Sequence, residues 1–213
     1  MQITLQQLAP TFIETEKISG SQVWNSDTVF LPGEKIQIVA PSGSGKTSFI
    51  HFLYGMRMDY TGSVRYDAES ISSFDAEKFS TYRKQYVSIV FQDLRLFTEQ
   101  TVLQNLEVKR QLDPYHTESR IVAMATRLGI ASKLNKPCKT CSYGEQQRIA
   151  IIRALQQPFD FLLLDEPFSH LDDANRKLAM ALIEEEAELR KAGIILADLK
   201  TTDHFNSTKT LNL

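Results

Sequence analysis

The stretch Lys35–Ser48 reads KIQIVAPSGSGKTS, and it decides the fold of this chain. Lys35–Ala40 is a short apolar run typical of a buried strand, and the residues from Lys46 to Tyr54 fit a helix. The turn between them is rich in glycine and serine. A strand, a glycine-rich turn and a helix in this order predict a loop whose backbone N–H groups surround a phosphate.

The loop fits the pattern G-x-x-x-x-G-K-[ST] except at its first position, where Ala40 replaces glycine. That change is mild only if Ala40 keeps a negative φ. We expect Lys46 to reach the β- and γ-phosphates of a bound nucleotide and Thr47 to ligate Mg²⁺, at the positive end of the helix dipole. The expected phosphate-binding residues are Pro41, Ser42, Gly43, Ser44, Gly45, Lys46, Thr47 and Ser48.

Further short apolar runs between turn residues predict more strands of a mostly parallel sheet. They are Val87–Phe91, Asp160–Leu164, Gly193–Ala197 and a last edge strand, Thr208–Leu213. From about Thr101 to Gln157 the patterns are only helical. We therefore predict one α/β domain over residues 1–213, with a helical subdomain at about residues 93–157. A later predicted helix carries Glu184–Glu186, which we interpret as a solvated face.

Two acids follow the predicted strand at Phe161–Leu164. Asp165 would hold Mg²⁺ through water, and Glu166 would orient or deprotonate the water that attacks the γ-phosphate. The alternative is that both acids merely end a strand. The phosphate loop upstream favours the catalytic interpretation.

Composition excludes several other classes of protein. The chain has 213 residues, 42% of them apolar and 23% charged, with a net charge of −2. Without a basic surplus, no nucleic-acid partner is expected. Apolar runs are too short to span a membrane, and Met1–Leu8 lacks a signal-peptide pattern, so we expect a cytoplasmic protein. Cys138 and Cys141 are interpreted as ordinary reduced thiols, because zinc needs four ligands and no second pair exists.

Three further motifs carry a resemblance to a family. Cys141–Arg148 reads CSYGEQQR and resembles the ABC signature Leu-Ser-Gly-Gly-Gln/Glu-Gln-Gln-Arg. Gln92, directly after a predicted strand, looks like the glutamine loop of ABC ATPases, and Ser169–Asp172 looks like the loop that contacts the partner subunit. Together with the phosphate loop and the acidic strand, these motifs follow the family's order over essentially the whole chain.

The resemblance implies a P-loop NTPase fold with a mostly parallel sheet, a helical subdomain and an antiparallel N-terminal β region. It also implies a homodimer that forms on ATP binding and encloses two ATP molecules head to tail. Ser142-x-x-Glu145 has a plain local interpretation too, as a capping box that opens a helix. Each nucleotide site would combine Lys46, Thr47, Gln92, Asp165 and Glu166 of one chain with Ser142, Gly144 and Glu145 of the other, and Gln92 would also ligate Mg²⁺.

The adenine ring should stack on an aromatic residue near the end of the first strand. Phe12 falls in that place, and Trp24 is a second candidate; ordinary packing is the alternative for either.

Departures from the family pattern bear on catalysis. Tyr143 replaces the first glycine of the signature pair, where the backbone should approach phosphate closely. Asp198 stands where the family has a catalytic histidine, and an aspartate would repel the γ-phosphate. His204 lies further on, at the lead into the last strand. We therefore expect hydrolysis, though a slow one.

The resemblance implies an energy-coupling subunit that docks, around Gln92–Gln100, on a separate membrane-spanning permease-type subunit at the inner face of the membrane. The stretch Phe91–Phe97 looks like the bacterial ATPases for lipoprotein release, macrolide export and cell division. A soluble ATP-driven switch without a membrane partner is the alternative. A P-loop kinase would leave the signature helix and Glu166 unexplained.

Overall fold

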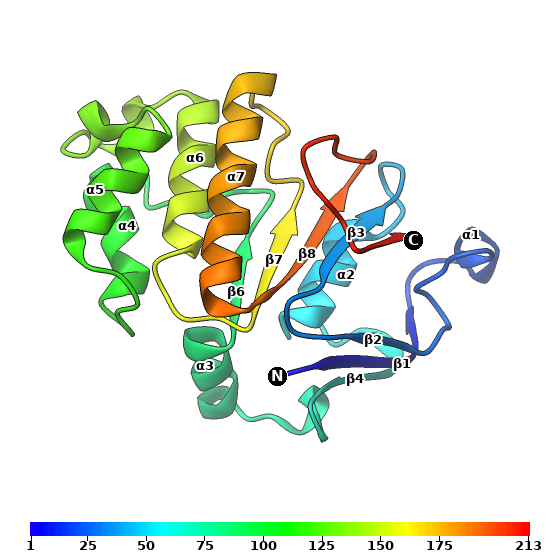
Figure 1. Cartoon of the computed structure of the whole chain (residues 1–213). Coiled ribbons are helices and arrows are strands. Elements are labelled where there is room, and N and C mark those ends of the chain that lie inside the picture. Colours follow the sequence, from blue (N-terminus) through cyan, green and yellow to red (C-terminus); the bar gives the residue numbers. More distant parts are fainter.

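The computed structural model covers residues 1–213 and describes all of them except the side chains of Thr15 and Lys17. A parallel sheet forms its centre, with the strand order β6-β7-β8-β3-β9 (Figure 1). These strands are β3 (Lys35–Val39), β6 (Val87–Val90), β7 (Phe161–Asp165), β8 (Gly193–Asp198) and β9 (Lys209–Asn212). The predicted α/β class and its edge strand are thus confirmed.

Alternate residues of the central strands pack on opposite faces of the sheet, because side chains alternate along a strand. Leu162 and Leu164 of β7 belong to one apolar cluster, and Leu163 belongs to another. The first cluster includes α6 (Tyr143–Ala154) and α7 (Asp173–Arg190), and the second includes α2 (Lys46–Leu53). Burial on both faces explains why these strands read as continuous apolar runs.

A second, antiparallel sheet has the order β2-β1-β4-β5 and packs on the α2 side of the core. Its strands are β1 (Ile3–Pro10), β2 (Thr28–Phe30), β4 (Tyr60–Tyr66) and β5 (Glu69–Ser70). The short helix α1 (Thr15–Ile18) follows β1. A 3₁₀ turn, η1 (Ile71–Ser73), and the helix α3 (Ala76–Gln85) lead from β5 back to the parallel sheet. This region is the antiparallel part that the resemblance implies.

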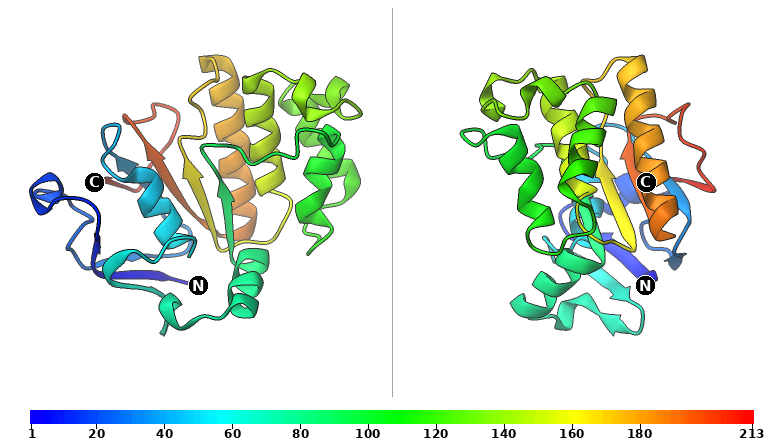
Figure 2. Two further views of the ribbon diagram at one scale, coloured as in Figure 1. Left: turned by 180° about the vertical axis from the view of Figure 1, so that it is seen from behind. Right: turned by 60° about the vertical axis from the view of Figure 1, so that its left-hand side comes forward.

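The segment of residues 93–157 contains α4 (Val102–Arg110), α5 (Glu118–Arg127) and α6, with the 3₁₀ turns η2 (Ala131–Lys133) and η3 (Cys138–Thr140). Figure 2 shows these helices gathered on the side of the sheet away from the antiparallel strands. They share an apolar cluster with α7. No helix of the described residues is long and apolar enough to cross a membrane.

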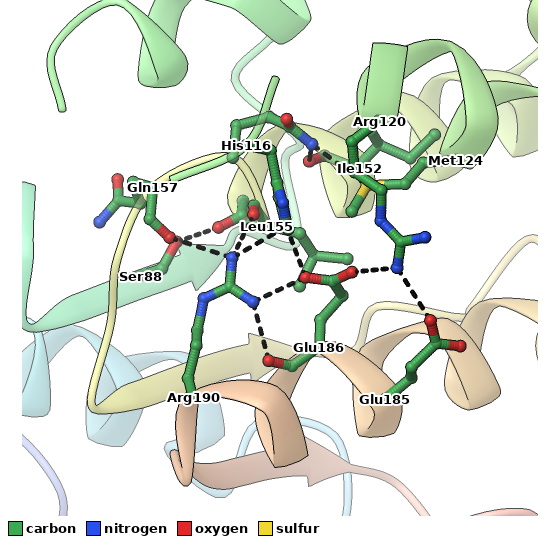
Figure 3. A network of polar contacts seen from close by, with 12 residues as sticks. Ser88, His116, Arg120, Met124, Ile152, Leu155, Gln157, Glu185, Glu186 and Arg190 are labelled. Atoms are coloured by element: carbon green, nitrogen blue, oxygen red, sulfur yellow. Dashed lines mark hydrogen bonds and ion pairs between the residues drawn. The ribbon is translucent and has the colours of Figure 1, made fainter. Parts of the chain in front are cut away.

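The interpretation of Glu184–Glu186 as a solvated face is wrong for Glu186, which is fully buried. Its carboxylate is bonded to His116 at 2.6 Å, Arg120 at 2.6 Å and Arg190 at 2.7 Å. Figure 3 shows these side chains converging from α5, its preceding loop and α7. Burial alone would raise the pKa of Glu186, but hydrogen bonds from the three partners outweigh it and lower the pKa to about 2.

Candidate functional site

The carboxyl ends of the parallel strands meet at one edge of the sheet, where open α/β sheets bind ligands. The loop after β3 runs into α2, and its glycines Gly43 and Gly45 have φ of 79° and 102°. Both values lie in the left-handed region that glycine tolerates without strain. Ala40 is not among the residues with positive φ, so the substitution at the first loop position carries no backbone strain.

A cavity of about 480 Å³ opens in front of this loop. It is lined by Phe12, Ile13, Glu14, Ser42, Gly43, Gly45, Lys46, Thr47, Ser48, Gln92 and Glu166. The structure thus brings together most residues that the sequence assigns to the nucleotide, from the phosphate loop and from the segments that follow β1, β6 and β7. Pro41 and Ser44 do not line the cavity; the Ser44 hydroxyl donates to the Pro41 carbonyl at 2.7 Å and closes the loop's turn.

Lys46 is buried at the base of the phosphate loop. Its amine donates to the carbonyls of Ala40 at 3.0 Å and Pro41 at 2.9 Å, and it pairs with Glu166 at 3.2 Å. Glu166 has φ of 45°, a left-handed value that is uncommon for a residue with a side chain. Its backbone N–H donates to Ala197 of β8 at 2.9 Å, which holds this strained turn in place.

Thr47, Gln92 and Asp165 meet in an adjoining cavity of about 330 Å³, which His51, Asp93 and Tyr143 also line. The Thr47 hydroxyl donates to the Gln92 amide oxygen at 3.1 Å, and Asp165 lines the same cavity. Asp165 is fully buried, and neither of its carboxylate oxygens has a hydrogen-bond partner among the described residues. Burial raises the pKa of Asp165 to about 6; the nearby Thr47 hydroxyl, which donates to Gln92 instead, and the Lys46 charge oppose this only in part.

An unpartnered buried carboxylate beside a hydroxyl and an amide oxygen is a set of hard oxygen donors, the kind that Mg²⁺ prefers. The residues therefore fit the expected cation: Thr47, Gln92 and Asp165 would hold it.

The two candidates for the adenine platform differ in exposure. Phe12 is 48% exposed and lines the larger cavity, while one of its faces carries the Arg57 guanidinium at 4.3 Å. Trp24 is 2% exposed and packs edge-on against Phe49 and Phe52 of α2. The Trp24 alternative is therefore wrong, because no ring can stack on a tryptophan inside the core.

Asp198 ends β8 at the same edge but does not line either cavity. One of its oxygens accepts from the Leu199 N–H at 2.7 Å and the other from the Thr202 hydroxyl at 3.4 Å. Burial raises its pKa, and the Glu166 charge adds to this. His204 pairs with Asp173 of α7 at 3.0 Å, so it does not supply the missing histidine.

The signature residues open helix α6. Ser142 and Glu145 form the expected capping box: the Glu145 N–H donates to the Ser142 hydroxyl, and the Ser142 N–H donates to the Glu145 carboxylate. At Gly144, a Cβ atom would lie 3.0 Å from the His170 carbonyl oxygen, which gives this glycine a packing role as well. None of these three residues lines the cavities of its own chain.

Tyr143, by contrast, reaches the smaller cavity from the start of α6. Its hydroxyl donates to the Gln92 carbonyl at 3.4 Å, and its ring lies on His170 with centroids 4.2 Å apart. From the sequence, Tyr143 was interpreted only as a replacement for a glycine, and no local pattern predicts its contact with Gln92. It also missed Gln147, which bonds to both Ser169 and His170 and so fixes the loop after the acidic strand.

The cysteine pair lies apart from this site. Cys138 and Cys141 are free and buried, and burial raises the pKa of Cys138 to about 11. Such a thiol is mostly protonated at neutral pH, which agrees with the interpretation as ordinary thiols.

Comparison with protein families finds that the model of the ABC transporter family matches residues 25–169. The macrolide export ATP-binding/permease protein MacB of Nitrosomonas europaea is 34% identical over 73% of this chain. The lipoprotein-releasing system ATP-binding protein LolD of Idiomarina loihiensis is 27% identical over 87% of this chain and 83% of its own length. The chain spans only 24% of the length of MacB.

Solved structures share the fold. The dimeric cassette MJ0796 superposes with a TM-score of 0.79 at 22% identity, covering 93% of this chain and 88% of that one. A putative ABC transporter ATP-binding protein from Pyrococcus furiosus gives a TM-score of 0.80 at 14% identity, covering 100% of this chain and 98% of its own.

Proposed function

Because this chain belongs to the ABC transporter family and is related to its LolD and MacB members, we propose that it binds Mg-ATP, dimerises around it and hydrolyses it to drive a membrane-spanning partner. The observation that carries the proposal is the buried, unpartnered carboxylate of Asp165 beside Thr47 and Gln92, at the mouth of a glycine-rich phosphate loop. A carboxylate costs free energy when buried without a partner, so such a group is retained for a ligand.

Each of these side chains, at the carboxyl ends of the parallel strands, would have a role in phosphoryl transfer. The amides of the loop would hold the β-phosphate, and Lys46 would move from Glu166 onto the γ-phosphate, since both are anions that compete for one amine. Glu166, freed of Lys46, would orient the attacking water and take its proton. A bound Mg²⁺ would neutralise charge that develops on the phosphate oxygens.

Ser142, Gly144 and Glu145 would act on the nucleotide of a second copy, because they do not line the cavities of their own chain. The N-terminus of α6 is a capped helix end, which suits the γ-phosphate of a facing protomer. MJ0796, one of the solved structures that share the fold, is described as a dimeric cassette. A homodimer is therefore the proposed active form.

A groove of about 550 Å³ along α4 is the proposed docking surface for the membrane partner. Phe97, 53% exposed, lines this groove and follows the glutamine loop in the chain. The groove is lined by Phe97, Gln100, Leu103, Gln104, Glu107, Val108 and Gln111. MacB is named an ATP-binding/permease protein and LolD an ATP-binding protein of a releasing system, which supports a permease-type partner. The chain would then act in the cytoplasm, at the inner face of the membrane.

The first experiment is a tagged purification from detergent-solubilised native cells, which identifies the proteins that co-elute. We expect a stoichiometric multi-span membrane protein, and its recovery should fall when Phe97 is replaced by serine but not when Leu189 on α7, which is 61% exposed, is replaced by serine. Recovery of soluble proteins alone would favour a soluble ATP-driven switch.

ATP turnover is tested separately on the purified chain. Lys46→Ala should abolish ATP binding, whereas Glu166→Gln should bind ATP, accumulate as a dimer in size-exclusion chromatography and lose turnover. A Glu166→Gln chain that hydrolyses ATP at the original rate would remove Glu166 from the mechanism.

A further inference from the structure

A third cavity, of about 270 Å³, lies far from the phosphate loop, between α3, the C-terminal end of α4 and the residue that ends α2. It is lined by Tyr54, Ala76, Ser80, Arg83, Lys84, Lys109 and Leu112. Figure 1 shows α3 below the helices of residues 93–157. Three of the lining side chains are cations and none is an acid.

Lys109 is the least compensated of these cations. No hydrogen bond or ion pair to its ammonium is found among the described residues, although its side chain is only partly accessible. Burial, together with the positive charges of Arg153 and Arg83, lowers its pKa to about 8. An ammonium held among like charges without a counter-ion is unfavourable, and an anion in the cavity would relieve this repulsion.

Arg83 is fixed in place beside it. Its Nη2 donates to the Gly55 carbonyl at 2.9 Å and its Nε to the Tyr54 carbonyl at 3.4 Å. The guanidinium also lies over the rings of Tyr54, at 5.1 Å, and Phe79, at 4.9 Å. Its Nη1 makes no hydrogen bond to any described residue. A guanidinium held this firmly loses little conformational entropy when it binds an anion.

Lys84 is the third cation that lines the cavity, and it remains available to bind an anion. Its ammonium lies 3.9 Å from Asp113, beyond hydrogen-bond distance, and the Asp113 carboxylate also accepts from Gln85 at 3.2 Å. Across the cavity, the hydroxyl of Ser80 has no hydrogen-bond partner in the described part of the chain. The cavity thus offers donors from two helices, α3 and α4.

We propose that this cavity is a binding site for a phosphate group, held by Arg83, Lys84 and Lys109. Several cations and a hydroxyl converging from different directions suit the oxygens of a phosphate better than the two oxygens of a carboxylate. The volume is several times the ~30 Å³ that one water molecule occupies, enough for a phosphate with a few waters but small for a nucleotide. The phosphate could belong to a free anion or to a lipid headgroup.

The site is independent of the proposed ATPase, because it shares no lining residue with the two cavities at the sheet edge. It adjoins the groove proposed for the membrane partner, since Lys109 and Glu107 lie close together on α4 and face different cavities. A phosphate bound here would neutralise the positive charge of Lys109 at the C-terminal end of α4, beside that groove.

Calorimetric titration of inorganic phosphate into the full chain tests the proposal. Lys46→Ala is the common background, so that the phosphate loop does not contribute. Lys109→Gln should weaken phosphate binding about tenfold or more, as expected for a lost charge-assisted hydrogen bond. The matched control is Lys177→Gln, which removes the same charge from an exposed position on α7 and should leave the affinity unchanged. Equal affinities for the two variants, or no phosphate binding at all, would overturn the proposal.

Vesicle sedimentation distinguishes the two sources of the phosphate. Binding to vesicles with phosphatidic acid that is lost in Lys109→Gln but kept in Lys177→Gln would identify a lipid headgroup. Phosphate binding without Lys109-dependent vesicle binding would identify a soluble anion. Should Lys109→Gln fail to fold, as judged by circular dichroism, Lys84→Gln replaces it in both assays, because the Lys84 side chain is 41% exposed.

Discussion

Replacement of Asp165 by asparagine should stabilise the nucleotide-free chain while it weakens Mg-ATP binding. The carboxylate is fully buried and unpartnered, and burial raises its pKa from the ordinary 3.8 to about 6. Because the folded-state pKa lies above the unfolded one, the ionised group destabilises the fold above pH ~6, and this destabilisation disappears as the pH falls towards ~4. The difference corresponds to about 3 kcal/mol, since each pKa unit is worth ~1.36 kcal/mol.

Urea unfolding at two pH values measures this effect. At pH 8, Asp165→Asn should raise the free energy of unfolding by up to about 3 kcal/mol with an unchanged m-value; at pH 4 the gain should nearly vanish. In a thermal melt with Mg-ATP, the same variant should lose most of the ligand-induced rise in Tm, because the carboxylate no longer holds the cation.

A second aspartate provides a control of opposite sign. Asp172 is exposed, caps α7 by accepting from the Asn175 N–H at 2.8 Å, and has a pKa lowered by this hydrogen bond. Asp172→Asn keeps the cap but removes the negative charge that the N-terminus of α7 favours, so it should destabilise the chain slightly at pH 8. If Asp165→Asn also destabilises the nucleotide-free chain at pH 8, the Asp165 carboxylate has favourable contacts of its own, and the argument for a cation site fails.

Four other substitutions are informative. Glu186→Gln should cost about 3 kcal/mol of stability at pH 7 in urea unfolding. Because the pKa of Glu186 is lowered to about 2, this contribution is full above pH ~4.5 and declines as the pH falls towards 2, and an equal cost at pH 2 would contradict the reasoning. Asp198→His should raise ATP turnover about tenfold or more by adding a donor to the γ-phosphate, and unchanged or lower turnover would show that this position is assigned wrongly. Tyr143→Gly should raise turnover at saturating ATP, since the backbone can then approach the facing nucleotide; a fall would assign the tyrosine a supporting role. Phe12→Ala should weaken ATP binding about tenfold and leave triphosphate binding unchanged in equilibrium titrations, whereas equal losses for both ligands would exclude adenine stacking.

The parallel core could be predicted from the sequence because its strands are buried on both faces and therefore read as continuous apolar runs. The helix α3 was not predicted, because Phe79 and Tyr82 alone pack against the core and none of its residues is fully buried, which makes a weak helical pattern. In β4, Gly62 would argue against a strand, yet glycine is required there: a Cβ atom would lie 2.2 Å from the Gln7 carbonyl oxygen. Local pattern alone does not reveal such close approaches.

The residues of the candidate site could be named from the sequence, because phosphate binding demands particular side chains at fixed spacing around one turn. The sequence left open what depends on packing between distant elements. Phe12 and Trp24 could be separated only by their burial. Glu186 looked like part of a solvated face, because its partners His116 and Arg120 lie about 70 residues away. The Tyr143 hydroxyl contacts Gln92 although the two residues are 51 positions apart in the chain, and no local sequence pattern predicts such a contact.

Three features lie together at the edge of the sheet, and Mg-ATP would change two of them. Asp165 is a buried carboxylate without a partner, Glu166 has a left-handed backbone, and Lys46 is paired with the residue that should act on water. A cation would satisfy the first feature, and a γ-phosphate would draw Lys46 away from Glu166. Ligand binding and local stability are therefore coupled at this edge: the substitution that makes the empty chain more stable is also the one that should impair its function.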